Sequence, residues 1–291
     1  MDFGSYQAIV LSPWGLLVLG LIIGSFMNVV IHRMPMILER QWRADAAAML
    51  ELPEPPADAA LAPAPLTLSS PPSRCPSCSH KIRWYENIPL FSWLALRGKC
   101  SACGTRISVR YPLIELTTGL LFAACGWRFG SDPTVLVWCG FVALLVTASA
   151  IDWDTTLLPD DLTLPLLWAG LVASALGWIP VPLHQSLWGA VVGYLSLWSV
   201  YWLFKLTTGK EGMGYGDFKL LAALGAWLGW HMVLPVVLAS SVLGAIVGIG
   251  MKLTSQLREG RYVPFGPFLA GAGLVVMFAG RDLVLEWLGW A

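Results

Sequence analysis

Long apolar runs constrain the fold of this chain more than any other feature. A helix needs about 20 residues to cross about 30 Å of hydrocarbon. Eight runs are candidates, near residues 8–30, 111–129, 134–152, 162–179, 184–204, 216–230, 232–251 and 265–280. The sixth run is short and its boundary with the seventh, at GWHMVLP, is indistinct. We therefore expect an all-α polytopic membrane protein of about eight transmembrane helices, with seven spans or a re-entrant segment as the alternative.

The distribution of charge supports this interpretation and predicts an orientation. Only 12% of the residues are charged, against about 25% in ordinary globular domains, and the zero net charge gives no indication of a nucleic-acid partner. Cytoplasmic loops retain Lys and Arg. Of the 18 basic residues, 16 fall on one side of an eight-span arrangement, and only Arg128 and Arg281 fall on the other. The sequence therefore predicts a multi-pass protein of a bacterial inner membrane with both termini in the periplasm.

The order of apolar and polar segments predicts three parts. Residues 1–30 contain the first transmembrane helix, residues 31–110 form a cytoplasmic insert, and residues 111–291 form a polytopic core. Residues 1–14 contain no basic region and no small-residue cleavage site, so we expect the first span to be retained and not removed as a signal peptide.

The insert is divided into a linker and a cysteine module. Residues 44–73 are rich in Ala and Pro and are expected to form a mobile linker, because they can bury little apolar surface. Two C-x2-C motifs follow, and they contribute Cys75, Cys78, Cys100 and Cys103. Four thiolates match the tetrahedral coordination of structural zinc, and a reducing cytoplasm disfavours disulfides.

The cysteines have alternative roles, and the nearby histidine also needs an interpretation. The four thiols could act as redox dithiols or carry no ligand. His80 is expected to be a solvated surface residue, because four thiolates already complete the tetrahedron. Cys125 and Cys139 lie inside predicted spans and are expected to pack as small apolar residues.

Acidic residues at the edges of membrane spans are costly and therefore indicate function. Asp152 ends the third predicted span, and Asp217 begins the sixth, within GMGYGD. In the predicted topology both lie at cytoplasmic helix ends, where two carboxyl groups can face each other. One ionised and one protonated aspartate sharing a water is the arrangement of aspartic proteases. Gly214 and Gly216 carry no side chain and would let a substrate backbone approach Asp217.

Structural roles compete with this interpretation. Asp160 and Asp161 precede an apolar run and are expected to cap its helix, and Asp154 is expected to be a solvated loop residue. Asp217 could also be a first-turn acid favoured by the helix dipole. From the residues alone, a structural and a catalytic role for Asp152 and Asp217 are about equally supported.

Four motifs, in this order, resemble those of type IV prepilin peptidases. They are GSFMNVVIHRMP, the paired C-x2-C, IDWDTTLLPDDLTLPLLW and GYGDFKL. The last is similar to the G-x-G-D motif of intramembrane aspartyl proteases. The resemblance extends from Gly24 to Pro267, in PFGPFLA, and the Pro/Ala-rich stretch before Cys75 is the departure from it.

The resemblance implies a bifunctional enzyme. The family cleaves the basic leader from type IV prepilins and type II secretion pseudopilins after a glycine, and then methylates the new α-amine with S-adenosylmethionine. The catalytic aspartates of the family fall on Asp152 and Asp217, and its cytoplasmic cysteines fall on the four expected zinc ligands. No Rossmann-type glycine-rich turn is present. Glu86 and Glu115 are candidates for the methyl-donor site, although a surface or capping role is the simpler interpretation of each.

Two other classes of protein share some of these features. A secondary transporter also has many spans and a few acids, but its site usually lies at mid-bilayer between internal repeats, and no convincing repeat is present here. A membrane scaffold that recruits an assembly partner through its zinc module would not need Asp152 and Asp217. Normal substrate processing by a double Asn variant would favour the scaffold.

Overall fold

The computed structural model describes residues 3–51, 66–253 and 263–290, with the side chains of residues 3–6 omitted. The described part is helical, and its β-structure is limited to two isolated bridges, Arg74 with Lys81 and Lys99 with Arg106. The chain forms two compact units, residues 1–127 and 128–291. The all-α class expected from the sequence is therefore confirmed.

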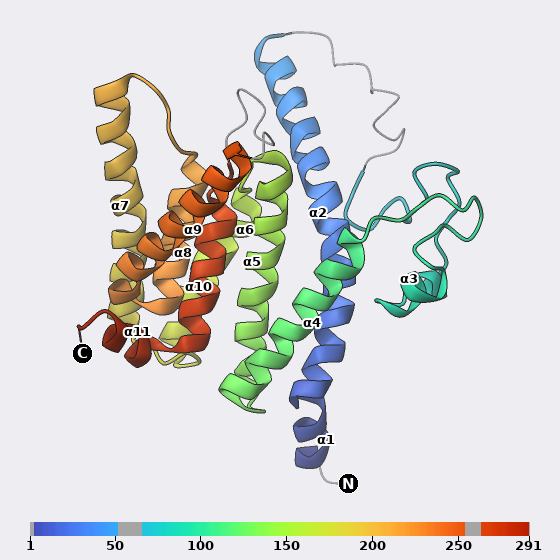
Figure 1. Ribbon diagram of the computed structural model, residues 1–291, viewed down its shortest axis with the longest axis horizontal. Coiled ribbons are helices and arrows are strands. Elements are labelled where there is room, and N and C mark those ends of the chain that lie inside the picture. Colours follow the sequence, from blue (N-terminus) through green and yellow to red (C-terminus); the bar gives the residue numbers. More distant parts are fainter. Residues whose placement is uncertain (1–2, 52–65, 254–262, 291) are drawn as a thin grey trace. The chain divides into compact units, whose positions relative to one another are not determined.

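The first unit is built on two long helices. Its elements are α1 (Phe3–Val10), α2 (Pro13–Met49), the short 3₁₀ helix η1 (Trp84–Asn87), α3 (Phe91–Ala95) and α4 (Arg110–Phe129) (Figure 1). A Cβ atom at Gly20 would lie 2.8 Å from the Cα of Gly119, and one at Gly24 would lie 2.8 Å from the Cα of Glu115. Glycine at these positions lets α2 and α4 pack closely, as small residues do between membrane helices.

The first long helix differs from the predicted span 8–30 at both ends. It begins at Pro13, because the Ser12 side chain accepts a hydrogen bond from the Gly15 amide at 3.2 Å and proline is favourable in the first turn. It continues to Met49. Residues 44–49, expected to be linker, are therefore helical, which is consistent with the high helix propensity of alanine. Residues 52–65 of the expected linker lie outside the described residues.

A buried arginine holds the last residues of the expected linker, which are therefore not mobile as predicted. Arg33, on α2, is 8% exposed. Its guanidinium donates to the carbonyl oxygens of Thr67 at 2.9 Å and of Pro71 at 2.6 Å. The segment that leads into the cysteine module is therefore held against α2 by hydrogen bonds from a charged donor, which are stronger than neutral ones.

The second unit is a helical bundle. Its elements are α5 (Val135–Thr155), α6 (Asp160–Ala175), α7 (Leu183–Thr208), α8 (Tyr215–Leu228), the 3₁₀ helix η2 (Trp230–Met232), α9 (Val233–Leu253), α10 (Gly266–Ala279) and α11 (Arg281–Trp287). The helix α8 packs against α6, α7 and α10 (Figure 1). Nine of the ten residues from Phe218 to Trp227 are buried. A helix that is apolar on all sides belongs in a core, and α8 is the core helix of this unit.

Two contacts hold α8 in place. On the α6 side, the Trp227 indole N–H donates to the Leu166 carbonyl at 2.8 Å. On the α7 side, a Cβ atom at Gly189 would lie 2.0 Å from the Gly225 oxygen, and one at Gly225 would lie 2.1 Å from the Gly189 oxygen. The two backbones touch at these glycines, so the position of α8 is fixed by backbone contact.

Each of the eight predicted spans overlaps one of these helices. In the described part of the chain, four helices are long and apolar enough to cross a membrane: α2, α5, α7 and the continuous segment η2 to α9. The pair α10 and α11, bent by 105°, adds a fifth if it is one span. The described part of the chain therefore has four or five candidate membrane spans, and the count of eight stays a prediction.

Candidate active site and metal centre

Asp152 lies in the last turn of α5 and is 4% exposed. Its Oδ2 accepts a hydrogen bond from the Gly266 amide at 3.0 Å. Gly266 is the first residue of α10 and is followed by Pro267, which has no amide hydrogen. The Gly266 amide, at the positive end of the α10 dipole, therefore points at one carboxylate oxygen and favours negative charge on it.

Asp217 lies in the first turn of α8 and is 7% exposed. Its Oδ1 is buried and, among the described residues, has no hydrogen-bond partner. A buried carboxyl oxygen without a partner is energetically costly, and such an exception to the pairing of buried polar groups requires a functional explanation.

Leu158 and two glycines bring these aspartates together. A Cβ atom at Gly266 would lie 2.6 Å from Asp152 Oδ2 and 3.0 Å from Leu158 Cδ1. On the other side of Leu158, a Cβ atom at Gly216 would lie 2.6 Å from Leu158 Cβ. The carboxyl groups are within electrostatic range of one another. The structure thus places the two sequence-predicted residues in one buried site, built from the ends of α5, α8 and α10.

The two glycines expected to admit a substrate backbone have different surroundings. The Cβ position of Gly216 is occupied by Leu158, so this glycine is required for packing. The Cβ position of Gly214 has only two atoms within 4 Å, and the nearer is Asp217 Oδ2 at 3.8 Å. Gly214 therefore leaves open space beside the carboxyl group.

The other acids of this region are exposed, unlike the buried pair. Asp160 accepts two contacts from the Lys219 ammonium, at 2.6 and 2.8 Å, and Asp161 and Asp154 are exposed. The N-cap residue of α6 is Pro159, and no side chain makes a capping hydrogen bond there. Asp160 and Asp161 are consequently first-turn acids of α6 and not the caps expected from the sequence.

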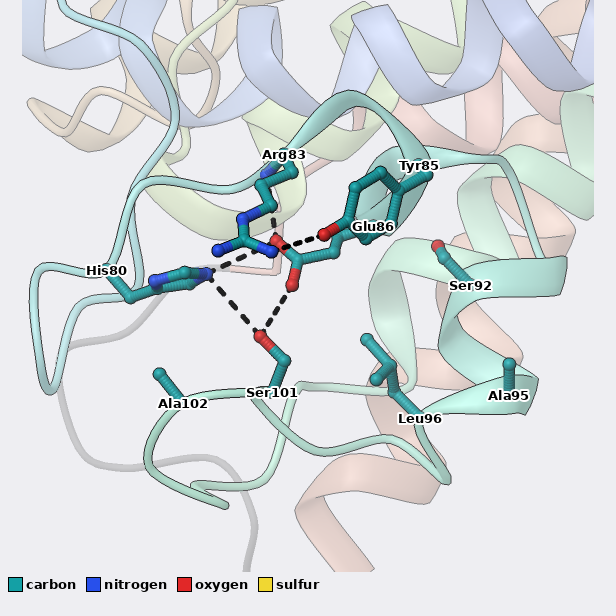
Figure 2. A pocket seen from close by; sticks show the side chains of 9 residues that line it. All are labelled: His80, Arg83, Tyr85, Glu86, Ser92, Ala95, Leu96, Ser101 and Ala102. Carbon is teal, nitrogen blue, oxygen red and sulfur yellow. Dashed lines mark hydrogen bonds and ion pairs between the residues drawn. The ribbon is translucent and has the colours of Figure 1, made fainter.

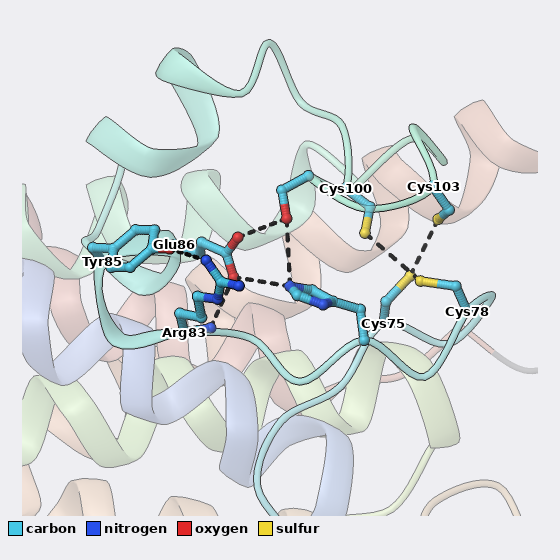
Figure 3. A network of polar contacts seen from close by, with 9 residues as sticks. Cys75, Cys78, Arg83, Tyr85, Glu86, Cys100 and Cys103 are labelled. Carbon is cyan, nitrogen blue, oxygen red and sulfur yellow. Dashed lines mark hydrogen bonds and ion pairs between the residues drawn. The ribbon is translucent and has the colours of Figure 1, made fainter.

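The four cysteines of the insert converge in the first unit. Cys75 Sγ lies 3.8 Å from Cys103 Sγ, Cys78 Sγ lies 4.0 Å from Cys100 Sγ, and all four sulfur atoms lie within 4.8 Å of one another (Figure 3). Thiolates bound tetrahedrally at 2.3 Å from a zinc ion are about 3.8 Å apart. The predicted grouping of the four thiols is confirmed, and their geometry fits a zinc ion.

Two similar turns present these thiols. In the first, the Ser79 amide donates to the Cys75 carbonyl at 2.9 Å, and in the second the Gly104 amide donates to the Cys100 carbonyl at 3.0 Å. Both donors have left-handed backbones, with φ of 59° at Ser79 and 71° at Gly104. Cys125 and Cys139 are buried in α4 and α5, as expected for apolar packing.

A carboxylate joins the two turns. Glu86, on η1, accepts hydrogen bonds from the Ser101 hydroxyl at 2.6 Å and from the Arg83 amide at 2.8 Å, and its Oε2 lies 3.3 Å from His80 Nε2 (Figures 2 and 3). The Arg83 amide and the Ser101 hydroxyl lower the pKa of Glu86 to about 2. Glu86 therefore remains a carboxylate throughout the physiological pH range.

The second candidate glutamate has a different environment. Glu115, on α4, is 8% exposed, and its Oε2 accepts a hydrogen bond from the Leu90 amide at 2.9 Å. Leu90 precedes α3 and has φ of 60°. Glu115 thus fixes the strained backbone at the start of α3, and the surface role considered from the sequence is wrong.

Sequence reasoning missed the structural roles of Gly266 and Leu158. The only sequence signal for Gly266 was its place in PFGP at the start of an apolar run. Leu158 lies within the motif IDWDTTLLPDDLTLPLLW, but the motif does not reveal which glycines this leucine will contact.

Comparisons with known proteins identify the family of this chain. Residues 18–129 match the profile of the bacterial peptidase A24 N-terminal domain, and residues 139–249 match that of the type IV leader peptidase family. No solved structure matches the chain at a significant level.

Curated relatives match along nearly the whole chain. A prepilin leader peptidase/N-methyltransferase of Stutzerimonas stutzeri is 53% identical over 279 residues, which are 94% of this chain and 93% of the relative. Proteins of the same name from Pseudomonas aeruginosa and Xanthomonas campestris are 49% and 51% identical, each over 94% of this chain and 93% of the relative. The apolar helices and these relatives together identify a multi-pass inner-membrane protein. The chain belongs to the prepilin leader peptidase/N-methyltransferase family.

Proposed function

We propose that this protein cleaves the leader from prepilins and pseudopilins with Asp152 and Asp217, and then methylates the new N-terminus. The observation that carries the peptidase proposal is the convergence of two buried carboxyl groups from α5 and α8 around Leu158. Membership of the family supports the substrate class, the cut after a glycine at the cytoplasmic face and the use of S-adenosylmethionine.

The surroundings of the two aspartates suggest different roles. The Gly266 amide favours negative charge on Asp152, so Asp152 is the general base that takes a proton from the attacking water. Asp217, whose Oδ1 lacks a partner among the described residues, is the general acid that protonates the leaving amine. Two close carboxyl groups in a low dielectric are expected to share one proton, and this chemistry requires no metal.

The four cysteines are proposed to hold one zinc ion with a structural role. Four thiolates leave no open coordination position for a substrate, which is the arrangement of structural sites. Zinc binding would then stabilise the turns around Cys75 and Cys100, because a metal bound only by the folded module adds to its folding free energy.

The test follows a purified prepilin by intact mass in liposomes, with and without S-adenosylmethionine. The parental enzyme should remove the leader and add one methyl group. Asp152→Asn and Asp217→Asn should each abolish cleavage, because neither remaining group can complete the proton transfers. Asp161→Asn is the matched control, since it removes an exposed carboxylate from the same region and should retain cleavage.

The outcomes separate the candidate functions. Cleavage by a folded Asn variant would remove that aspartate from the mechanism. Cleavage without methylation would retain the peptidase and discard the second activity. No mass change with folded parental enzyme would favour a transporter or a scaffold.

A further inference from the structure

A pocket of about 630 Å³ lies beside the cysteine cluster in the first unit. This volume is in the range of pockets that bind small molecules and cofactors. Figure 2 shows His80, Arg83, Tyr85 and Glu86 along one side of it, and Ser92, Ala95 and Leu96 on α3 and the turn after it. Ser101 and Ala102, from the second cysteine turn, complete the lining.

The polar side of the pocket carries two opposite charges, on the largely buried Glu86 and on the exposed Arg83. The Glu86 carboxylate has a side-chain exposure of 9% and is oriented by the Ser101 hydroxyl, the Arg83 amide and His80 Nε2 at 3.3 Å. The Arg83 guanidinium donates to the Tyr85 hydroxyl and lies 5.8 Å from the centre of that ring. An ammonium and a carboxylate on one ligand would match Glu86 and Arg83 respectively.

The remaining lining suits an apolar, planar group. Ala95, Leu96 and Ala102 present only carbon atoms from their side chains, and the ring of Tyr85 lies at the polar edge (Figure 2). A ligand that joins an α-amino acid head group, a cationic centre and a flat heteroaromatic ring through a short chain would use both sides. These are the parts of S-adenosylmethionine.

We infer that this pocket is the methyl-donor site, with Arg83 binding the donor's carboxylate, Glu86 its ammonium group, and the apolar side its adenine ring. The inference rests on the proposed methyl transfer and specifies its site. In the transfer, the lone pair of the neutral N-terminal amine forms a new N–C bond to the methyl group as the S–C bond breaks. The electrons of that bond stay on sulfur, giving a thioether, and the amine loses a proton to solvent.

The experiment measures the dissociation constant of S-adenosylmethionine by calorimetry, with the full-length protein in lipid nanodiscs. Arg83→Gln removes the guanidinium but retains the amide that holds Glu86. Ala95→Trp fills the apolar side without changing a charge. Arg106→Gln is the matched control, because Arg106 is an exposed arginine of the same module that does not line the pocket.

Arg83→Gln and Ala95→Trp should each raise the dissociation constant about tenfold or more, as expected for a lost charge-assisted hydrogen bond or a steric block. Arg106→Gln should change it less than about twofold, because a solvated charge outside the site contributes little. Zinc content, measured by mass spectrometry, should stay at one ion per chain in every variant, which separates loss of a binding group from loss of folding.

Three results would overturn the inference. Unchanged affinity in both pocket variants would place the donor elsewhere. Loss of zinc together with donor binding in both variants would assign these residues to folding. The proposed methyl transfer itself would be refuted if the parental enzyme cleaved prepilin but neither bound the donor nor methylated the product. Normal methylation with unaffected variants would refute only this location.

Discussion

At the scale of single residues, the geometry of the site depends on a glycine, which has no side chain, as well as on the aspartates. Gly266 has room for a hydrogen but not for a methyl group, because a Cβ atom there would lie 2.6 Å from Asp152 Oδ2. The same residue supplies the amide that orients this carboxylate at 3.0 Å. The position and the charge of Asp152 therefore both depend on Gly266.

Gly266→Ala should lower kcat/KM for leader cleavage by about 100-fold, since a misplacement of about 1 Å at a reacting group costs about this much. Its pH–rate profile should also shift, because the altered contact changes the charge preference of Asp152, whereas simple loss of folded enzyme would leave the profile unchanged. Gly271→Ala is the control, since this glycine of the same helix has nothing within 4 Å of its Cβ position. Equal activity of the two variants would contradict this role for Gly266.

The candidate site residues could be predicted from the sequence, because residue type and spacing indicate them. The packing contacts that position these residues could not. Acids at span edges made Asp152 and Asp217 candidates, and only the resemblance to family motifs favoured a catalytic over a structural role. The paired C-x2-C motifs predicted the grouping of the four cysteines from their spacing. The contacts of Gly216 and Gly266 with Leu158 join segments that are about 60 to 110 positions apart in the chain. Local patterns carry no information about such contacts.

At the scale of elements, the crossing of α7 and α8 determines where the Asp217 end of the core helix lies. Gly189 and Gly225 bring the two backbones into direct contact. Gly193 extends the crossing, because its Cβ position is 2.6 Å from the Leu221 oxygen. The spacing of four residues between Gly189 and Gly193 is the small-residue pattern of closely packed membrane helices.

Gly189→Ala or Gly225→Ala should destabilise the second unit by about 1–3 kcal/mol or more, because the helices must separate to accept the new methyl group. Thermal unfolding in detergent is the measurement, and the midpoint should fall in both variants. Gly140→Ala on α5 has open space at its Cβ position and should be neutral or slightly stabilising, since alanine favours helix. If all three variants melted alike, the crossing would not be tightly packed.

Helix positions were predicted well from the sequence, and helix ends were predicted less well. The apolar runs located a helix at each of eight places, because burial in lipid or core needs continuous apolar residues. The ends depend on capping and on neighbouring segments. Ser12 starts α2 later than its apolar run begins, and residues 44–49 continue this helix although a linker was expected.

At the scale of the whole molecule, the lengths of the helices bear on the number of membrane crossings. The helices α6 and α8 have 16 and 14 residues, so at 1.5 Å per residue they span about 24 and 21 Å. Both are shorter than the roughly 30 Å of a hydrocarbon core. The predicted eight-span topology nevertheless requires both α6 and α8 to cross the membrane. The helix α8 is shielded from lipid because it is buried among α6, α7 and α10.

Reporter fusions at two positions test whether the chain crosses the membrane an odd or an even number of times after Gly209. Between Gly209 and the C-terminus, the eight-span arrangement has three crossings, by α8, α9 and α10, so the two positions lie on opposite sides of the membrane. If only α9 and the bent pair α10–α11 cross, the two positions lie on the same side. We expect a phosphatase that is active only in the periplasm to be inactive when fused after Gly209 and active when fused after Ala291, and a fluorescent protein that matures only in the cytoplasm to give the reverse pattern. The same result at both positions would contradict the three crossings after Gly209 and with them the eight-span arrangement.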